Sequence, residues 1–460
     1  MLKRLSIEHF KGFYDRQTVD FAIPDQENGG SGLTLIVGPN NAGKTTIIES
    51  LLFNTEKRLK ESERHPDRSP TIEITNTKDQ AASFTNVNNG SLICNVGIDH
   101  GLVFELIPSR RFWENQFNGS WQFGNLIQKS ISSELRSSQI LSIGPILKTI
   151  QEDARLKDRF DNYLKRVVPH FSNWNVDTDD AGQDYIKYQT NSGGYHKANL
   201  LGDGIISLFR IVAHLVHDED STFIIDEPEL SLHPASQRRL SSILSELSMT
   251  KQIIVSTHSP HFANWKDFEN GAKYVRLNKH EDRQCTTHAL HNDKDYARFI
   301  SDYAAKYQKP QLLDVAAKEI LFNDKVLFLE GQEDVGIIRK WYEDNERPLN
   351  YEIFGYGVDG ETNMKLFLEL SRDLGLKRVA ALYDKGTQSY DGDRREYPDF
   401  HLHQLSTEDI RDKISSCPYT DECPNGKNRE GTFDSKGVLK PEQGASFVKI
   451  LEAIEVFMRG

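Results

Sequence analysis

The sequence has few cysteines, no long apolar run and no excess of positive charge. Its 460 residues include four cysteines, which are too few for a disulfide framework and favour a reducing compartment. No stretch reaches the roughly 18–20 apolar residues of a membrane-spanning helix. The start, MLKRLSIEHF, carries charge but lacks the apolar segment of a secretory signal. We therefore expect a cytoplasmic protein with no membrane partner.

The charge balance is acidic, with 56 basic residues, 68 acidic residues and a net charge of −12. This excludes a generally basic surface but leaves room for a local groove that binds nucleic acid. Charged residues make up 27% and apolar residues 37%, a globular composition that at this length favours two or three domains. Cys417 and Cys423 are interpreted as loop thiols, because no paired Cys/His set accompanies them.

Hydrophobic periodicity predicts two α/β units joined by a helical segment. Strands are expected in the first 25 residues and over 33–37, 91–107, 222–226, 252–256 and 272–290, and helices over 125–170 and 200–217. The polar stretch 55–90 is expected to be a loop or an insertion. From residue 325 strands alternate with helices again, which indicates a second parallel sheet.

A phosphate-binding loop is predicted at GPNNAGKT, which follows an apolar strand and precedes a helix. The pattern places Gly38, Gly43, Lys44 and Thr45 in register with G-x-x-x-x-G-K-[ST]. Backbone N–H groups would surround the phosphates, Lys44 would reach the β- and γ-phosphates, and Thr45 would offer its hydroxyl to Mg²⁺. The remaining expected nucleotide contacts from this loop are Asn40, Asn41 and Thr46.

Three further segments fit a nucleotide site. The run TFIIDE ends on Asp226, which can hold Mg²⁺, and Glu227, which can orient the attacking water. His258 follows another strand and could sense the γ-phosphate, although a lone histidine is more often a cap or core residue. The segment LLGDGIIS, with Gly202, Asp203 and Gly204, could open a phosphate-binding helix or serve as an ordinary cap.

In their order along the chain, these four segments resemble the ABC-type ATPase head shared by SMC, RecF and OLD proteins. The resemblance covers residues 1 to about 290 and implies an α/β P-loop ATPase domain over 1–292, with a helical insertion at about 125–170. It implies that Asp226 and Glu227 are the Walker B pair, that His258 is the switch histidine and that LGDG is a degenerate signature motif. It also implies ATP and magnesium as cofactors and at least a homodimer, with ATP held between two protomers.

The second unit places carboxylates where two predicted strands end. Glu330 follows KVLFL, and Asp384 follows RVAALY. Since the carboxyl ends of parallel strands meet at one edge of a sheet, these side chains should converge and suit Mg²⁺ or Mn²⁺. Ordinary solvation of strand-end acids is the alternative interpretation.

This half resembles a TOPRIM domain, and an ABC head followed by a TOPRIM domain is the plan of the OLD family. The helical pattern with mixed charge over 293–322 is interpreted as a connector, so a smaller TOPRIM-like α/β domain is expected over 323–460. The resemblance implies catalytic roles for Glu330 and Asp384, and metal ligation by Glu330, Asp334, Asp384 and Asp409. The family's Asp-x-Asp is incomplete, because Gly386 stands in place of the second aspartate. Asp391 or Asp393 could offset that loss. Glu408, Asp409 and Asp412 resemble a later acidic segment of OLD nucleases, or else begin a solvated helix.

Two functional hypotheses follow from the resemblance. The first is an ATP-regulated, metal-dependent DNA nuclease of the OLD type in anti-phage defence, with DNA as a partner. The second is an ATPase sensor or scaffold that holds and releases a separate effector protein, like the ATPase AriA of PARIS systems, with a degenerate TOPRIM-like domain. A RecF-like repair ATPase would explain the head but not the second unit.

Overall fold

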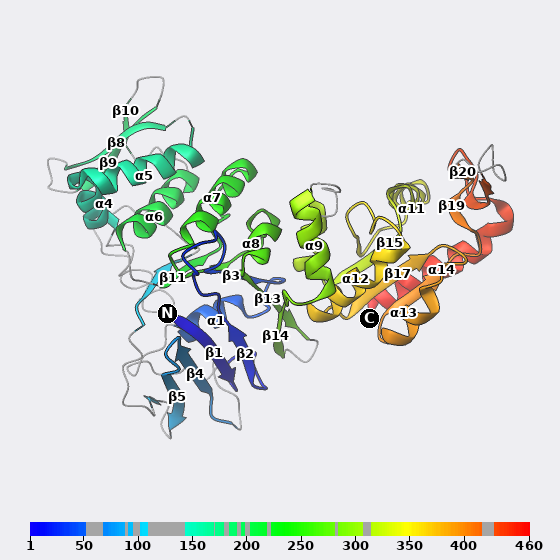
Figure 1. The fold of residues 1–460 in the computed structure, drawn as a ribbon, viewed down its shortest axis with the longest axis horizontal. Helices are drawn as coiled ribbons and strands as arrows, with labels where there is room; N and C mark the ends of the chain where they lie inside the picture. The colour runs from blue at the N-terminus through cyan, green and yellow to red at the C-terminus, as the bar shows by residue number, and fades with distance from the viewer. Residues whose placement is uncertain are drawn as a thin grey trace. The chain divides into compact units, whose positions relative to one another are not determined.

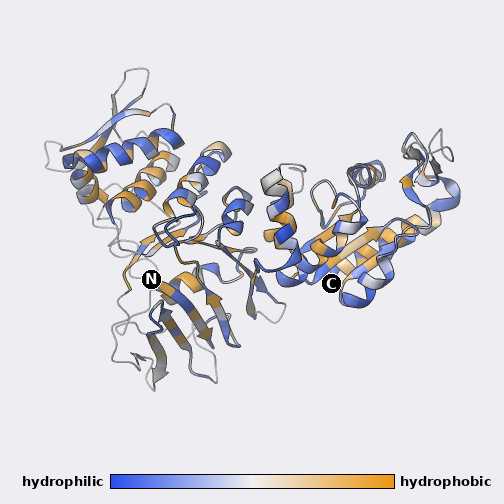
Figure 2. Cartoon of the chain, viewed as in Figure 1, coloured by the Kyte–Doolittle hydropathy of each residue, from blue (hydrophilic) through white to orange (hydrophobic). Residues whose placement is uncertain are grey.

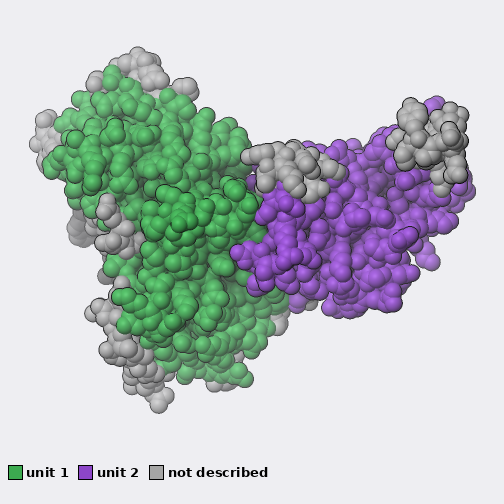
Figure 3. Space-filling model, viewed as in Figure 1, with its two compact units in different colours: residues 1–289 green, residues 290–460 purple. Residues whose placement is uncertain are grey.

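The chain forms two compact units, residues 1–289 and 290–460 (Figures 1 and 3). The computed structural model describes all residues except 52–67, 88–90, 95–101, 109–142, 170, 179–183, 191–194, 198–202, 219–221, 281–283, 307–313 and 416–426. Cys417 and Cys423 lie outside the described residues, and Cys285 is a buried free thiol. In the described part of the chain, no helix is both long and apolar enough to cross a membrane.

The centre of the first unit is a mixed sheet built mainly from buried parallel strands. Its strands, in spatial order, are β14 (Cys285–Ala289), β13 (Lys273–Lys279), β3 (Leu33–Val37), β12 (Ile253–Ser256), β11 (Thr222–Asp226) and β7 (Phe104–Ile107). All neighbouring pairs are parallel except β13 with β14. Every residue of β3, β11 and β12 is buried, as expected for continuous apolar runs inside a parallel sheet. The predicted strands at these three positions are confirmed.

Helices precede or follow these strands and present apolar faces to the core. They include α1 (Lys44–Leu51), α6 (Asp203–His217), α7 (Pro234–Leu247) and α8 (Trp265–Glu269). Helix α7 begins where His233 caps the N–H of Ala235 and a proline occupies the first turn, a position where its missing N–H costs nothing. The sequence therefore sets the start of this helix locally.

A second sheet corrects the prediction for the polar stretch 55–90. Its order is β2 (Gln17–Asp20), β1 (Leu2–Glu8), β4 (Thr71–Asn76), β5 (Ala81–Val87) and β6 (Ser91–Cys94). Strand β4 alternates partly buried and buried residues, so Ile72 and Ile74 reach the core while threonines and Glu73 face outward. The abundance of polar residues on the outer face concealed this period of two, and the loop prediction is wrong for 71–76 and 81–87.

The predicted helical insertion at 125–170 is helical where the structure describes it. Helices α4 (Ile143–Glu152) and α5 (Ala154–Val167) pack near α6, whereas 125–142 lies outside the described residues. The sequence analysis missed the antiparallel strands β8 (Phe171–Thr178), β9 (Asp184–Thr190) and β10 (Tyr195–Lys197) that follow. Trp174 of β8 meets Phe160 and Phe209 in an aromatic cluster with ring centroids 4.9–5.8 Å apart. Aromatic rings therefore join this small sheet to the helices.

The second unit contains its own parallel sheet. Its order is β16 (Glu352–Ile353), β15 (Lys325–Leu329), β17 (Arg378–Tyr383) and β18 (His401–Gln404). Helices α11 (Gln332–Asp344), α12 (Glu361–Asp373), α13 (Tyr390–Glu396) and α14 (Pro441–Arg459) accompany it. Figure 2 shows the hydrophobic character of the central strands, which are buried along nearly their whole length. The alternation of strands and helices that the sequence indicated is therefore present.

Two segments of this unit differ from their interpretation in the sequence. Helix α9 (Asp295–Lys306), interpreted as part of a connector, packs on α12 through Phe299 and Phe367, whose ring centroids lie 6.1 Å apart. The acidic segment near residue 409 is a strand, β19 (Asp409–Arg411), paired with β22 (Gly431–Phe433). A solvated helix start is therefore wrong for Asp409, which is 1% exposed.

Candidate functional site

The phosphate-binding loop joins β3 to α1 through a backbone that needs glycine. Gly38 has φ +134° and Gly43 has φ +102°, both in the region that disfavours side chains. A Cβ on Gly38 would lie 2.3 Å from the carbonyl oxygen of Leu277, so β13 also excludes any larger residue here. These constraints account for the glycine spacing seen in the sequence.

Lys44 lies at the start of α1 with its ammonium turned back into the loop. Its Nζ donates to the carbonyl oxygens of Gly38 at 2.9 Å and Pro39 at 2.8 Å. Burial lowers the pKa of Lys44 to about 8, although the nearby carboxylates of Glu227 and Asp226 act in the opposite direction. The ammonium is thus held ready for anionic oxygens that would replace the carbonyls.

The acidic pair stands at the end of β11, beside the end of β12. Asp226 pairs in register with Ser256, and the backbone N–H of Glu227 donates to the Ser256 carbonyl at 2.7 Å. Glu227 has φ +46°, an uncommon conformation for a residue with a side chain. The chain therefore turns sharply here, at the strand edge that also carries the loop after β3.

Glu229 organises the turn that carries His258, and the sequence analysis missed it. Its carboxylate accepts the Thr257 hydroxyl at 2.8 Å and the His258 backbone N–H at 2.6 Å. Burial raises the pKa of Glu229. The signal was present in the sequence, since an acid two residues after Glu227 can reach back to a neighbouring strand end.

His258 faces the acidic pair. Its Nε2 lies 3.7 Å from Oε1 of Glu227, and burial together with the Lys44 charge lowers its pKa. A neutral imidazole is therefore favoured at pH 7, able to donate or accept one hydrogen bond.

These segments enclose one cavity of about 560 Å³. Its walls are Asn40, Asn41, Gly43, Lys44, Thr45, Thr46, Glu227, His258 and Lys279. Eight of these nine were predicted from the sequence, and Lys279 from the end of β13 was not. The volume falls in the range of small-molecule sites, and the lining suits a polyanion.

The predicted signature segment is not part of that lining. Gly202 lies outside the described residues, and Asp203 is the first residue of α6. Gly204 approaches the loop after β11 so closely that a Cβ would lie 2.3 Å from the Ser231 carbonyl oxygen. Close backbone packing thus explains Gly204 within a single chain.

In the second unit, Glu330 and Asp384 do meet at one edge of the sheet. They follow β15 and β17, which pair in parallel with Leu329 opposite Leu382. Oε1 of Glu330 accepts the Asp384 backbone N–H at 2.9 Å and the Thr387 hydroxyl at 3.1 Å. The strand-end convergence expected from the sequence is therefore present.

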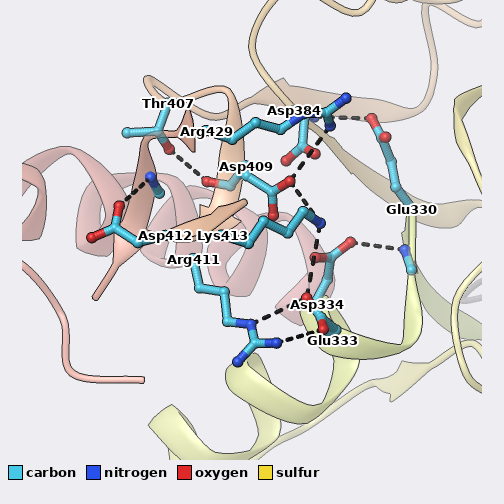
Figure 4. Close-up of polar contacts among 12 residues, drawn as sticks. Glu330, Glu333, Asp334, Asp384, Thr407, Asp409, Arg411, Asp412, Lys413 and Arg429 are labelled. Atoms are coloured by element: carbon cyan, nitrogen blue, oxygen red, sulfur yellow. Dashed lines mark hydrogen bonds and ion pairs between the residues drawn. The ribbon is translucent and has the colours of Figure 1, made fainter. Parts of the chain in front are cut away.

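Asp334 and Asp409 lie with Glu330 and Asp384 in a group of four carboxylates, which we call the acidic cluster (Figure 4). Burial, reinforced by Asp334, Glu330 and Asp409, raises the pKa of Asp384 to about 8. Burial also raises the pKa of Asp334 to about 7, with Asp409 and Glu330 contributing, and raises that of Glu330. Such mutual repulsion is the condition that a bound divalent cation relieves.

Basic side chains that the sequence analysis missed partly balance the acidic cluster. Lys413 Nζ lies 2.7 Å and Arg429 3.6 Å from Oδ2 of Asp409 (Figure 4). Oδ1 of Asp409 is buried and has no hydrogen-bond partner among the described residues. The unsatisfied oxygen of Asp409 and the three further carboxylates are donors of the kind that Mg²⁺ or Mn²⁺ prefers, although among the described residues no three of these four groups place ligand atoms within 4.8 Å of one another.

The position of the missing aspartate offers no ligand. Gly386 has φ +87° and lies on an exposed turn. Asp391 is exposed on α13, and Asp393 is buried where its carboxylate accepts the Tyr383 hydroxyl at 2.9 Å. The fourth carboxylate comes from Asp409 instead.

The fold and the loop define the class of this protein. Two family models match the chain. One, described as "AAA domain", matches residues 4–167, and the other, described as "AAA domain, putative AbiEii toxin, Type IV TA system", matches residues 112–264. The first unit is therefore an ATP-binding AAA-type ATPase domain.

Comparison with curated proteins adds the nearer relationships. The chain is 26% identical over 403 residues to an OLD nuclease of Thermus scotoductus, covering 73% of this chain and 72% of that protein. It is 23% identical over 265 residues to the endonuclease GajA of Bacillus cereus, but spans only 37% of it. It is 24% identical over 282 residues to the Septu protein PtuA of Bacillus thuringiensis, covering 51% of this chain and 68% of that one. The chain is a relative of the OLD nuclease, GajA and PtuA, and the resemblance to OLD proteins seen in the sequence is confirmed.

Among solved structures, the SMC head domain from Thermotoga maritima is 16% identical and covers 63% of this chain and 99% of its own, with a TM-score of 0.37.

Replacement of Lys44 tests the phosphate-binding loop. Lys44→Ala removes the buried cation and should weaken ATP binding by at least about 100-fold. Binding of a fluorescent ATP analogue measures the effect, with Lys266→Ala, which removes an exposed lysine of α8, as the matched control. ATP affinity equal to the parent's would contradict this assignment.

The lowered pKa of Lys44 predicts a pH dependence. Below its pKa of about 8 the ammonium is charged, and as the pH rises through that value the ammonium loses its proton and ATP affinity falls. Because phosphate favours the charged form, ATP binding at about pH 8.5 should take up protons. Titration calorimetry in two buffers of different ionisation enthalpy measures this uptake, and identical heats in both buffers would refute it.

Proposed function

We propose that this protein is an ATP-regulated, metal-dependent DNA nuclease that acts in anti-phage defence. The observation that carries the proposal is the acidic cluster, where Glu330, Asp334, Asp384 and Asp409 gather in a unit separate from the ATP-binding one. Similarity to an OLD nuclease and to the endonuclease GajA supports it.

In the ATPase unit, four residues of the cavity wall and the adjacent Asp226 would act on ATP. Lys44 holds the β- and γ-phosphates, and Thr45 and Asp226 would hold Mg²⁺, which neutralises phosphate charge when bound. Glu227 orients the attacking water and accepts its proton. His258, neutral and beside Glu227, donates a hydrogen bond to the γ-phosphate.

The proposed assembly is at least a dimer. By the ABC-head resemblance, the start of α6, with Gly202, Asp203 and Gly204, would face the ATP held by a partner's phosphate-binding loop. ATP binding would then join two heads, and hydrolysis would release them.

In the second unit, the acidic cluster would hold Mg²⁺ or Mn²⁺, which polarises a phosphodiester and activates water when bound. Glu330 is fixed by Asp384 N–H and Thr387, and Asp334 by the N–H of Gly331 at 2.8 Å. These residues orient their free oxygens before any cation arrives. Lys413 and Arg429 lie where they can contact an anionic DNA backbone as well as Asp409.

The scaffold hypothesis is favoured by one observation, the bare turn at Gly386. A degenerate second unit would hold an effector protein rather than cut DNA, and ATP turnover would control its release. The two hypotheses share the ATPase unit and differ in whether the acidic cluster is catalytic.

Substitution of the water-orienting residue tests the ATPase assignment. Glu227→Gln keeps the shape of the side chain but removes its basicity, so ATP should still bind while turnover falls roughly 100-fold to 10,000-fold. His258→Ala should also lower turnover with little change in ATP affinity. Phosphate release and size-exclusion chromatography with ATP measure turnover and the trapped oligomer, and unchanged turnover in Glu227→Gln would remove that residue from the mechanism.

DNA cleavage tests the second unit. Supercoiled and linear DNA are incubated with Mg²⁺ or Mn²⁺, with and without ATP, and the parent is compared with Glu330→Ala and Asp384→Ala. Cleavage should be lost in both variants and kept in Asp391→Asn, which alters an exposed carboxylate of α13. A parent that hydrolyses ATP but cuts no DNA would overturn the nuclease proposal and favour the scaffold.

A further inference from the structure

A third group of possible ligands lies in the first unit, on the last turn of α6 and on the edge strand β7. Glu105 belongs to β7, His214 to α6, and Asp218 follows α6 directly. One ligand atom from each residue lies within 4.8 Å of the other two. Neither the ATPase nor the nuclease proposal uses this group.

The imidazole at its centre is buried without a satisfactory partner. The His214 side chain is 3% exposed, and that of Glu105 is 22% exposed. Nδ1 of His214 lies 2.7 Å from Oε1 of Glu105, yet the ring is not oriented for a hydrogen bond, and Nδ1 has no hydrogen-bond partner among the described residues. A buried ring nitrogen that lacks a hydrogen bond calls for a partner such as an ion, and the adjacent carboxylate can serve as a second ligand.

The third carboxylate is held in place by the end of the helix. The Asp218 backbone N–H donates to the His214 carbonyl at 3.1 Å, and the Asp218 carbonyl accepts Lys251. Its Oδ1 shares a hydrogen bond of 3.2 Å with Nδ1 of His217. The backbone and one carboxylate oxygen of Asp218 are therefore fixed, which leaves the other carboxylate oxygen as the candidate ligand.

This group is distinct from the ATP cavity. In the parallel pairing of β7 with β11, Glu105 lies opposite Phe223, three residues before Asp226. Three residues of strand correspond to about 10 Å. The group therefore lies toward the amino ends of the parallel strands, whereas the phosphate-binding loop follows the carboxyl end of β3.

We propose that Glu105, His214 and Asp218 form a zinc site with an open fourth position for water. One imidazole and two carboxylates match the donors that Zn²⁺ accepts, whereas Mg²⁺ and Ca²⁺ prefer oxygen alone. A zinc ion here links the edge strand β7 to the end of α6. The site is independent of the proposed nuclease function.

Zinc binding to the full chain tests the site. Protein stripped with chelator is dialysed against Zn²⁺ in excess Mg²⁺, and the bound metal is counted by elemental analysis. The parent should hold one more zinc per chain than His214→Gln or Glu105→Gln. His233→Ser, which removes an exposed histidine but keeps a residue that caps α7, should match the parent.

Two controls separate this result from misfolding and from the acidic cluster. Asp218→Asn alters a partly exposed position, and it should lose the zinc while its circular dichroism matches the parent's. Zinc should raise the unfolding temperature of the parent and of Asp384→Asn but not of the site variants. The proposal is overturned if the parent binds no zinc, if folded Asp218→Asn or His214→Gln binds as much zinc as the parent, or if Asp384→Asn alone loses it.

Discussion

The parallel pairing of buried strands is the constraint on which both candidate sites depend. In the first unit, β3, β11 and β12 end at the same edge of the sheet. The phosphate-binding loop, Asp226 and His258 therefore converge there, although they come from three separate segments of the chain. In the second unit, β15 and β17 do the same for Glu330 and Asp384. Without these two sheets, the acidic residues and the glycine-rich loop would lie apart in space and form no site.

The two sites differ in how their charge is balanced. In the ATP cavity, the buried ammonium of Lys44 lies near the carboxylates of Glu227 and Asp226, an arrangement that suits a phosphate group together with a bound cation. In the acidic cluster, burial and the neighbouring carboxylates raise the pKa of Glu330, Asp334 and Asp384, and the nearby cations are Lys413 and Arg429 beside Asp409. The first arrangement suits a nucleotide and the second a cation.

Helix α6 connects three of the features discussed above. Its first turn contains Asp203 and Gly204, its middle contributes Phe209 to the aromatic cluster, and its last turn carries His214 beside Glu105. The proposed zinc site would hold the far end of the helix whose start is proposed to face a partner's ATP. Apolar packing along its length, including fully buried Ile211 and Leu215, keeps these ends in a fixed relation.

The sequence by itself determined the phosphate-binding loop, the strand-end acids and the alternation of strands and helices, because each depends on local spacing and on runs of buried residues. It did not reveal β4 and β5, whose polar outer faces masked a period of two, or the small sheet after α5. Only the tertiary structure showed that Asp409 is buried and lies with Glu330, Asp334 and Asp384, that Glu229 accepts the backbone N–H of His258, and that Glu105 meets His214. These contacts join residues on different elements, so the side chains meet only through the packing of those elements, even where the sequence marks a candidate such as Glu229.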